Sequence, residues 1–204
     1  MPRIGTRRAV LRPLEDRDAG DLLRIFGDPR VTRYWSSPPL ADRPAAERLL
    51  ASIRRGLDAG DLLQWGLARR ADDRVLGTVT LARIDRTNRR AELGFALGAE
   101  QWGAGWMAEA LPAAVDHAFE GLGLHRLEAD VDPRNAASLV RLERLGFLRE
   151  GHLRERWHVQ GEIQDSVLLG LLAADWRAAR GTDHRGPADR APARPPRDDE
   201  HARR

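Results

Sequence analysis

The sequence predicts an α/β fold with a mixed, mostly antiparallel central sheet of about seven strands and flanking helices. Segments with strand alternation and segments with helical periodicity follow one another along the chain. Three consecutive strand-like segments in the middle of the chain are joined only by short turns, which is typical of an antiparallel meander. The length of 204 residues suffices for one domain with a sizeable core, but not for two catalytic domains.

The first half of the chain is expected to contain a strand, two helices and the meander. Aspartates that can cap a helix precede an apolar helical pattern, and apolar residues at helical spacing mark the second helix. The expected elements are a strand over 7–13, a helix from Asp16 or Asp18 to about residue 27, a loop over 31–39, a helix over 43–59 and strands over 64–69, 74–84 and 91–97.

The second half alternates helices and strands. Pro112 lacks a backbone donor, so we expect a bend or a loosened turn inside its helix. Gly146 is expected to end the following helix, and Gln160-Gly161 to form a hairpin turn. The expected elements are a glycine-rich turn over 98–105, a helix carrying 107–122, a strand over 126–131, a helix from about 136 to 145 and a hairpin of strands over 152–159 and 163–172.

The composition changes near the end of the chain. Residues 181–204 are rich in Pro, Gly and mixed charge and contain no large aliphatic or aromatic side chain. Such a segment has little to bury, so we expect a disordered tail. Residues 1–180 are then expected to form the whole folded domain.

Composition excludes several classes of protein. The chain contains no cysteine, which excludes disulfides, thiolate metal sites and a cysteine nucleophile. No apolar run approaches the roughly 18 residues of a membrane span, and no signal-peptide pattern is present, so a cytoplasmic protein without a membrane partner is expected. The six histidines do not have metal-site spacing, so we expect no metal.

The charge does not indicate a nucleic-acid-binding protein. The formal net charge is only +3, although the sequence pI is about 10.6. All 34 Lys and Arg positions are arginine, which does not deprotonate in proteins and therefore raises the pI. These arginines are interleaved with 31 acidic residues instead of being clustered, so no nucleic-acid partner is expected.

The glycine-rich segment Trp102-Gly103-Ala104-Gly105-Trp106-Met107 lies between a strand and a helix. Gly103 and Gly105 are expected to allow a close approach of the backbone and to adopt the left-handed conformation with positive φ. Successive N–H groups at a helix N-terminus favour a phosphate or pyrophosphate, although an ordinary strand-to-helix turn has the same glycines. A P-loop is excluded because the chain has no lysine. Gly103, Gly105 and Ala108 match the dinucleotide-binding pattern G-x-G-x-x-[G/A]. That pattern requires a parallel βαβ unit, however, and the antiparallel meander upstream argues against one.

A second segment, His125-Arg126-Leu127-Glu128-Ala129-Asp130-Val131-Asp132-Pro133-Arg134-Asn135 through "LGF" at 145–147, resembles the strand–Asn–helix block of the GNAT N-acyltransferases. The segments "ELGF…WGAGWMAEAL" and "GFLREGHLRE…DSVLLGLL" are similar to the RimJ/RimL-type branch, named for acetylating ribosomal-protein N-termini. The resemblance covers about residues 7–176. It implies a GNAT fold and transfer of an acetyl group from acetyl-CoA to a primary amine, either a protein N-terminus or a small molecule.

The resemblance also implies where acetyl-CoA binds. Residues Phe95, Ala96 and Leu97 would offer backbone groups to the pantetheine arm, and the loop from Trp102 to Met107 would hold the pyrophosphate. Asn135 would contact the pantetheine arm and Arg141 the CoA phosphates, although Asn135 is also a good helix N-cap and Arg141 could be a surface residue. Trp102 stands where the family usually has Gln or Arg, and Met107 stands where it usually has Gly or Ala.

Amide formation requires a base for the amine proton and a donor near the leaving sulfur. The resemblance favours Glu92 as the base, through a water molecule, and Ser138 as the donor. Trp157 replaces a glutamate of some branch members, so Glu155, expected on the same strand face by alternation, is the alternative base. Each residue could instead have no catalytic role: Glu92 could be an exposed strand residue in a salt bridge, and Ser138 a solvated serine in the first turn of its helix.

The acceptor side is expected to be walled by aromatic side chains: Tyr34, Trp35, Trp65 and Trp157. The same aromatics could simply belong to the core. The departures from the family pattern keep a second function open, a GNAT-shaped module that binds acyl-CoA without turnover. A monomer or a homodimer is expected.

Overall fold

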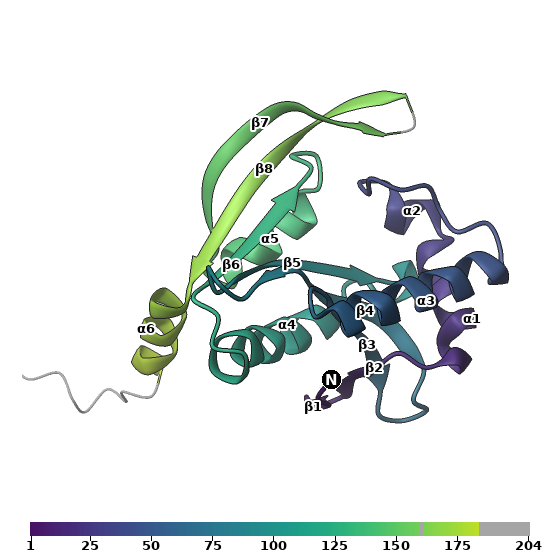
Figure 1. The fold of residues 1–204 in the computed structure, drawn as a ribbon, viewed down its shortest axis with the longest axis horizontal. Coiled ribbons are helices and arrows are strands. Elements are labelled where there is room, and N and C mark those ends of the chain that lie inside the picture. Colours follow the sequence, from purple (N-terminus) through teal and green to yellow (C-terminus); the bar gives the residue numbers. More distant parts are fainter. Residues whose placement is uncertain (160, 184–204) are drawn as a thin grey trace, which may run out of the picture.

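The computed structural model, which describes residues 1–159 and 161–183, contains a single eight-stranded sheet in the order β1-β2-β3-β4-β5-β6-β8-β7 (Figure 1). The strands are β1 (Ile4–Gly5), β2 (Ala9–Pro13), β3 (Leu63–Arg69), β4 (Val75–Asp85), β5 (Arg90–Leu97), β6 (Arg126–Val131), β7 (Leu148–Val159) and β8 (Glu162–Leu172). The helices are α1 (Ala19–Phe26), α2 (Pro29–Thr32), α3 (Arg43–Ala59), α4 (Trp106–Asp116), α5 (Ala136–Arg144) and α6 (Ala173–Asp183), with short 3-10 turns η1 (Asp16–Asp18) and η2 (Ala99–Gln101) and a π-helical turn η3 (His117–Gly121).

The predicted α/β class and the mostly antiparallel sheet are confirmed. Strands β3, β4 and β5 form the expected meander, and every strand pair is antiparallel except β5 with β6. The sheet has eight strands instead of about seven because β1 pairs with β2 through Ile4↔Leu11 and Gly5↔Val10. Two residues are too few to produce a recognisable alternation, so β1 left no signal in the sequence.

Three local features differ from the expected elements. The predicted loop over 31–39 begins inside α2, where Asp28 caps the helix by accepting a hydrogen bond from the Arg30 N–H. The helix α4 continues through Pro112, and the widened turn comes later, at η3. Helix α6 follows β8 directly and extends to Asp183, three residues into the predicted tail; residues 184–204 lie outside the described part of the chain.

Two groups of helices pack on opposite faces of the sheet. The adjacent residues Val75 and Leu76 of β4 are both buried but belong to different hydrophobic clusters, as alternation along a strand requires. The cluster with Val75 contains α1 and α3, and the cluster with Leu76 contains α4. None of the helices in the described ranges is long and apolar enough to cross a membrane.

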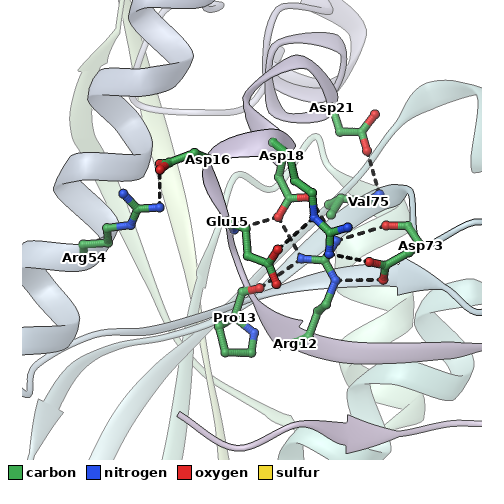
Figure 2. A network of polar contacts seen from close by, with 10 residues as sticks. Arg12, Pro13, Glu15, Asp16, Asp18, Asp21, Arg54, Asp73 and Val75 are labelled. Atoms are coloured by element: carbon green, nitrogen blue, oxygen red, sulfur yellow. Dashed lines mark hydrogen bonds and ion pairs between the residues drawn. The ribbon is translucent and has the colours of Figure 1, made fainter.

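A buried arginine, Arg12, connects β2 to the meander (Figure 2). The Arg12 guanidinium is 0% exposed and donates to both carboxylate oxygens of Asp18, at 2.8 and 2.9 Å. Its Nε donates to Asp73 Oδ1 at 2.9 Å, and its remaining donors reach the carbonyls of Pro13 and Asp73. All five N–H groups of the guanidinium are therefore used, which fixes β2, η1 and the β3–β4 turn relative to one another.

The sheet opens between β5 and β6. The two strands pair only through Arg90↔Arg126, Ala91↔Leu127 and Glu92↔Glu128, although both continue beyond Glu92 and Glu128. Strand β6 remains paired with β8 on its other side as far as Val131. The second halves of β5 and β6 therefore diverge, and the long β7–β8 hairpin projects from the sheet on the β6 side of the opening (Figure 1).

Candidate active site

A cavity of about 390 Å³ lies at the opening between β5 and β6. Its walls come from β4, from the middle of β5 and the end of β6, from α5 and its N-cap, from the segment between α1 and α3 and from the β7–β8 hairpin. The predicted residues Glu92, Phe95, Asn135 and Ser138 all line it, as do the predicted acceptor-side aromatics Tyr34, Trp35 and Trp157. The structure therefore brings together residues that are more than one hundred positions apart in the sequence.

The register of β5 determines which backbone groups face the opening. In an antiparallel pair, alternate residues direct both backbone groups to the same neighbour. Gly98 donates to the Leu76 carbonyl, and Ala96 lies opposite Thr78, so the even-numbered residues of this stretch bond to β4. Phe95 and Leu97 consequently face the open side, whereas Ala96 does not, which corrects the expectation that all three offer backbone groups there.

The glycine-rich loop has the predicted left-handed conformation. Gly103 has φ +76° and Gly105 has φ +78°, and Gly105 is the N-cap of α4. The first N–H groups of α4 have no intrahelical partner, and no other described residue accepts from the N–H groups of residues 103–105. These donors, at the positive end of the helix dipole, can accommodate a phosphate or pyrophosphate.

The side chains of the loop are used for packing. Trp106 and Met107 are buried in the core, so only their backbone amides can contribute to a phosphate site. Trp102 is 52% exposed, and its indole Nε1 donates to the Leu97 carbonyl at 2.8 Å. Trp102 therefore occupies one of the open-side acceptors of β5 instead of offering a polar side chain to a phosphate.

Glu92 lies where β5 and β6 separate. Its side chain is 29% exposed, and its Oε2 accepts a hydrogen bond from Arg83 Nη1 at 2.6 Å. Burial raises the pKa of Glu92, and the nearby Asp130 and Glu128 raise it further, against the opposing effect of Arg83 and Arg156. A half-buried carboxylate with a raised pKa at the wall of a cavity fits a proton acceptor.

The first turn of α5 places Asn135 and Ser138 side by side. Asn135 Oδ1 accepts a hydrogen bond from the Ser138 N–H at 3.2 Å, so the N-cap role of Asn135 is confirmed. Both residues also line the cavity, and the two roles therefore coexist. Arg141, one turn further, is partly exposed, and its side chain has no hydrogen-bond or ion-pair partner among the described residues, which leaves its guanidinium free to bind a phosphate.

Three aspartates line the same cavity and were not predicted: Asp130, Asp132 and Asp165. Asp132 is buried, which on its own would raise its pKa, but hydrogen bonds from the side chain and backbone of Arg134 outweigh this and lower the pKa of Asp132. Asp130 is paired with Arg156 at 2.9 Å. Alternation along β6 could have placed Asp130 on the same side as Glu128. The sequence alone could not show that β5 and β6 diverge after Glu92 and Glu128.

Among the described residues, no group of three or more His, Cys, Asp and Glu side chains is arranged to hold a metal ion.

The aromatic wall differs from the expectation at one position. Tyr34 and Trp35 line the cavity from the segment after α2, and Trp157 lines it from β7, where its Nε1 donates to Ser166 Oγ at 2.9 Å. Trp65 does not contribute, because it is 0% exposed in the core, with its Nε1 bonded to the Pro2 carbonyl. For Trp65 the alternative interpretation therefore holds: it is a core residue and does not line the acceptor side.

Glu155 is not placed as alternation predicted. The pairing of β7 with β8 shifts between Leu153↔Ser166 and Trp157↔Gln164, so β7 contains a bulge there. Glu155 has φ +54°, is exposed, and donates its N–H to Asp165 Oδ1 at 2.8 Å. Because a bulge breaks the alternation of side chains, Glu155 does not share the cavity-facing position of Trp157, and it is not among the cavity-lining residues.

Comparison with known proteins identifies the family. A family profile described as the GNAT acetyltransferase domain matches residues 8–148, and the chain therefore belongs to the GNAT acetyltransferase family. The chain is 34% identical over 176 residues to the uncharacterized N-acetyltransferase p20 of Bacillus licheniformis, covering 86% of this chain and 99% of that protein. It is 30% identical over 185 residues to the ribosomal protein uS5-alanine N-acetyltransferase of Escherichia coli, covering 87% and 94%.

A solved structure has the same fold. The structure of Mycobacterium smegmatis RimJ in complex with CoA-disulfide superimposes with a TM-score of 0.76, at 24% identity, and covers 88% of this chain and 95% of that chain. The GNAT fold and the resemblance to the RimJ-type branch are confirmed. The protein is an N-acetyltransferase, and the alternative of a binding module without turnover is set aside.

Proposed function

We propose that the cavity between β5 and β6 is where acetyl-CoA donates its acetyl group to a primary amine, with Glu92 as the proton acceptor. The observation that carries this proposal is the divergence of the two strands immediately after Glu92↔Glu128. It leaves the backbone groups of Phe95 without a strand partner in the cavity wall, close to the half-buried Glu92 carboxylate on the same strand.

The residues present fit acetyl-CoA. An extended pantetheine arm contains amides that can bond to the open edge of β5 at Phe95 and to the Leu97 N–H, as an added strand would. The strand leads directly to the loop at Gly103 and Gly105, where left-handed backbone and free N–H groups suit the pyrophosphate. Arg141, without a partner in the described structure, is proposed to reach the phosphates.

The proposed reaction is a direct attack. The amine nitrogen forms a bond to the thioester carbonyl carbon, and the carbon–sulfur bond breaks. Glu92 accepts the amine proton, through a water molecule, because only the neutral amine is a nucleophile. The open backbone N–H groups of β5 stabilise the negative oxygen that develops on the carbonyl. Ser138, which lines the cavity from the first turn of α5, donates a hydrogen bond to the departing sulfur.

The acceptor amine is proposed to enter between the segment after α2 and the β7–β8 hairpin, against Tyr34, Trp35 and Trp157. The similarity to the uS5-alanine enzyme favours the α-amine of a protein N-terminus, and a small-molecule amine is the second class. The aromatic rings can pack on the acceptor while Asp130 and Asp165 attract a positively charged amine.

The test is release of free CoA from acetyl-CoA in the presence of peptides beginning with alanine or serine, and of diamines and polyamines. Because the protein contains no cysteine, a thiol reagent detects only the CoA that is released. Mass spectrometry of the same mixtures must show one added acetyl group on the amine. Failure of every amine to stimulate CoA release, with acetyl-CoA bound, would contradict the proposal.

Substituting valine for Gly105 is expected to weaken acetyl-CoA binding strongly. Gly105 has φ +78°, where a β-branched side chain is strained, and the loop backbone would have to move away from the phosphate position. Isothermal calorimetry with acetyl-CoA measures the effect. Gly60→Val is a matched control, because Gly60 has the same φ of +78° and ψ of 12° at the end of α3, with nothing within 4 Å of its added Cβ. Equal losses of affinity in both variants would assign the effect to backbone strain alone.

A further inference from the structure

The loop from Trp102 to Met107 contains no charged side chain of its own. The side chain of its first residue, Trp102, has one polar group, the indole N–H, and this group donates to the Leu97 carbonyl. A charged group nevertheless reaches the loop from another part of the chain. Arg8, immediately before β2, lies about one hundred positions away in the sequence and contacts both the loop and the first turn of α4.

Arg8 makes four contacts around the start of α4. Its Nη2 donates to the Ala104 carbonyl at 2.9 Å, and its Nε donates to Glu109 Oε1 at 2.5 Å. Its backbone N–H donates to the other oxygen of Glu109 at 3.2 Å. Its guanidinium carbon also lies 4.3 Å from the centre of the buried Trp106 ring. The side chain is therefore held from several directions although it is 35% exposed.

The contact with Ala104 fixes one peptide plane of the loop. In a trans peptide, the carbonyl of one residue and the N–H of the next point in opposite directions. The hydrogen bond from Arg8 to the Ala104 carbonyl consequently directs the Gly105 N–H away from Arg8. Between two glycines with positive φ, this plane has few other restraints, and a rotated plane would present a carbonyl oxygen to the phosphates.

We infer that Arg8 is a positioning residue for acetyl-CoA, which orients the Ala104–Gly105 peptide so that the loop presents N–H groups to the pyrophosphate. Glu109 holds the guanidinium in place by accepting from the Arg8 Nε and from the Arg8 backbone N–H. The inference rests on the proposed acetyl-CoA site, and it assigns a role in that site to a residue outside the loop and the cavity.

The experiment compares two donors on the intact protein, acetyl-CoA and S-acetyl-pantetheine, which carries the same thioester but no pyrophosphate. Arg8→Met keeps an unbranched side chain over Trp106 and removes the hydrogen bond to Ala104. We expect the Kd for acetyl-CoA to rise by about 10- to 100-fold, as for loss of a charge-assisted hydrogen bond. The kcat at saturating acetyl-CoA and the kcat/KM for S-acetyl-pantetheine are expected to remain within about twofold.

Arg7→Met is the matched control, since it removes the same charge from the neighbouring residue. Arg7 is 80% exposed and reaches Glu109 at 3.4 Å without contacting the loop. Equal losses of acetyl-CoA affinity in the two variants would show a general charge effect and overturn the inference. Equal losses with both donors, or an unchanged Kd in Arg8→Met, would overturn it as well.

A second variant covers the case in which Arg8→Met fails to fold. Glu109→Gln leaves Arg8 in place but weakens its anchor, and the same selective loss for acetyl-CoA is expected, at a smaller size. An unchanged preference for acetyl-CoA over S-acetyl-pantetheine in this variant would contradict the inference. Failure of the proposed function is distinguishable from failure of this inference, because the unsubstituted protein itself would then release no CoA from acetyl-CoA with any amine.

Discussion

Replacing Glu92 with glutamine is expected to lower kcat by about 10²- to 10⁴-fold while leaving the Kd for acetyl-CoA unchanged. Glutamine has nearly the same shape but cannot accept a proton from the attacking amine. The rate constants are measured by CoA release at saturating acetyl-CoA, and the Kd by calorimetry. An effect of this size corresponds to about 3–5 kcal/mol of transition-state stabilisation.

The pH dependence separates a base from a structural carboxylate. Burial raises the pKa of Glu92, so its acidic limb in the rate profile is expected at a higher pH than for an ordinary glutamate. The amine contributes a limb of its own. In Glu92→Gln the limb of the carboxylate disappears, and the limb of the amine remains. Profiles of kcat/KM for the two proteins, measured with the same acceptor, distinguish the two limbs.

Stability provides an independent readout for the same variant. A carboxylate whose pKa is raised in the folded state is stabilising only at low pH, and above its folded pKa the charged form costs stability. Removing the charge is therefore expected to leave the melting temperature at neutral pH unchanged or slightly higher. A loss of activity without a loss of stability points to chemistry, since Arg83, the partner left behind, is 64% exposed and can be hydrated.

Glu128→Gln is the matched control for this prediction. Glu128 lies directly opposite Glu92 in the β5–β6 register, but it is paired with Arg90 and Arg126 and does not line the cavity. The kcat of the Glu128→Gln protein is expected to stay near that of the unsubstituted protein. A near-normal kcat in Glu92→Gln with an unchanged pH profile would reject Glu92 as the base, and it would favour a mechanism in which positioning suffices and bulk water takes the proton.

The parts of the site that could be predicted from the sequence are those determined by local backbone. Gly103 and Gly105 predicted a left-handed loop at a helix start, and Asn135 predicted a helix cap three residues before Ser138. These features depend on neighbouring residues and are encoded by short patterns. The same reasoning located the starts of α1, α3, α4 and α5 and the meander that leads to the loop, but it predicted no helix at α6.

The parts that could not be predicted depend on how distant segments pair. Whether Glu155 or Trp157 faces the cavity is decided by a bulge against β8, which shifts the alternation within β7. Whether the backbone groups of Ala96 face the opening depends on which residues of β5 form hydrogen bonds with β4, and this follows from the register of the two strands. Arg8 joins the loop only through the tertiary contact with Ala104, and nothing in the surrounding arginine-rich sequence distinguishes it from Arg7.

The second large effect concerns stability and lies away from the site, at Arg12. Arg12→Met is expected to destabilise the fold by about 3–5 kcal/mol, because it leaves the buried carboxylate of Asp18 without its partner. For a protein of this size, that corresponds to a fall in Tm of roughly 6–20 °C. The hydrogen bonds that Arg12 donates to Asp18 raise the pKa of the Arg12 guanidinium, so the charge is present at every accessible pH.

The change in stability should itself depend on pH. A hydrogen bond from Arg12 holds the pKa of Asp73 below its ordinary value. A carboxylate with a lowered folded pKa contributes stability above its unfolded pKa of about 3.9, and this contribution is lost as the pH falls through the folded value. The difference between the unsubstituted protein and Arg12→Met is therefore expected to be largest near neutral pH and to narrow in acid.

Two further variants separate the buried ion pair from a general loss of charge. Arg54→Met removes an exposed partner of Asp16 in the same region (Figure 2), and it is expected to cost no more than about 1 kcal/mol. The double variant Arg12→Met with Asp18→Asn removes both buried charges, and it should be more stable than Arg12→Met alone. Urea denaturation of the four proteins at neutral pH measures these differences. If Arg12→Met were no less stable than Arg54→Met, the buried guanidinium could not be what fixes β2, η1 and the β3–β4 turn together.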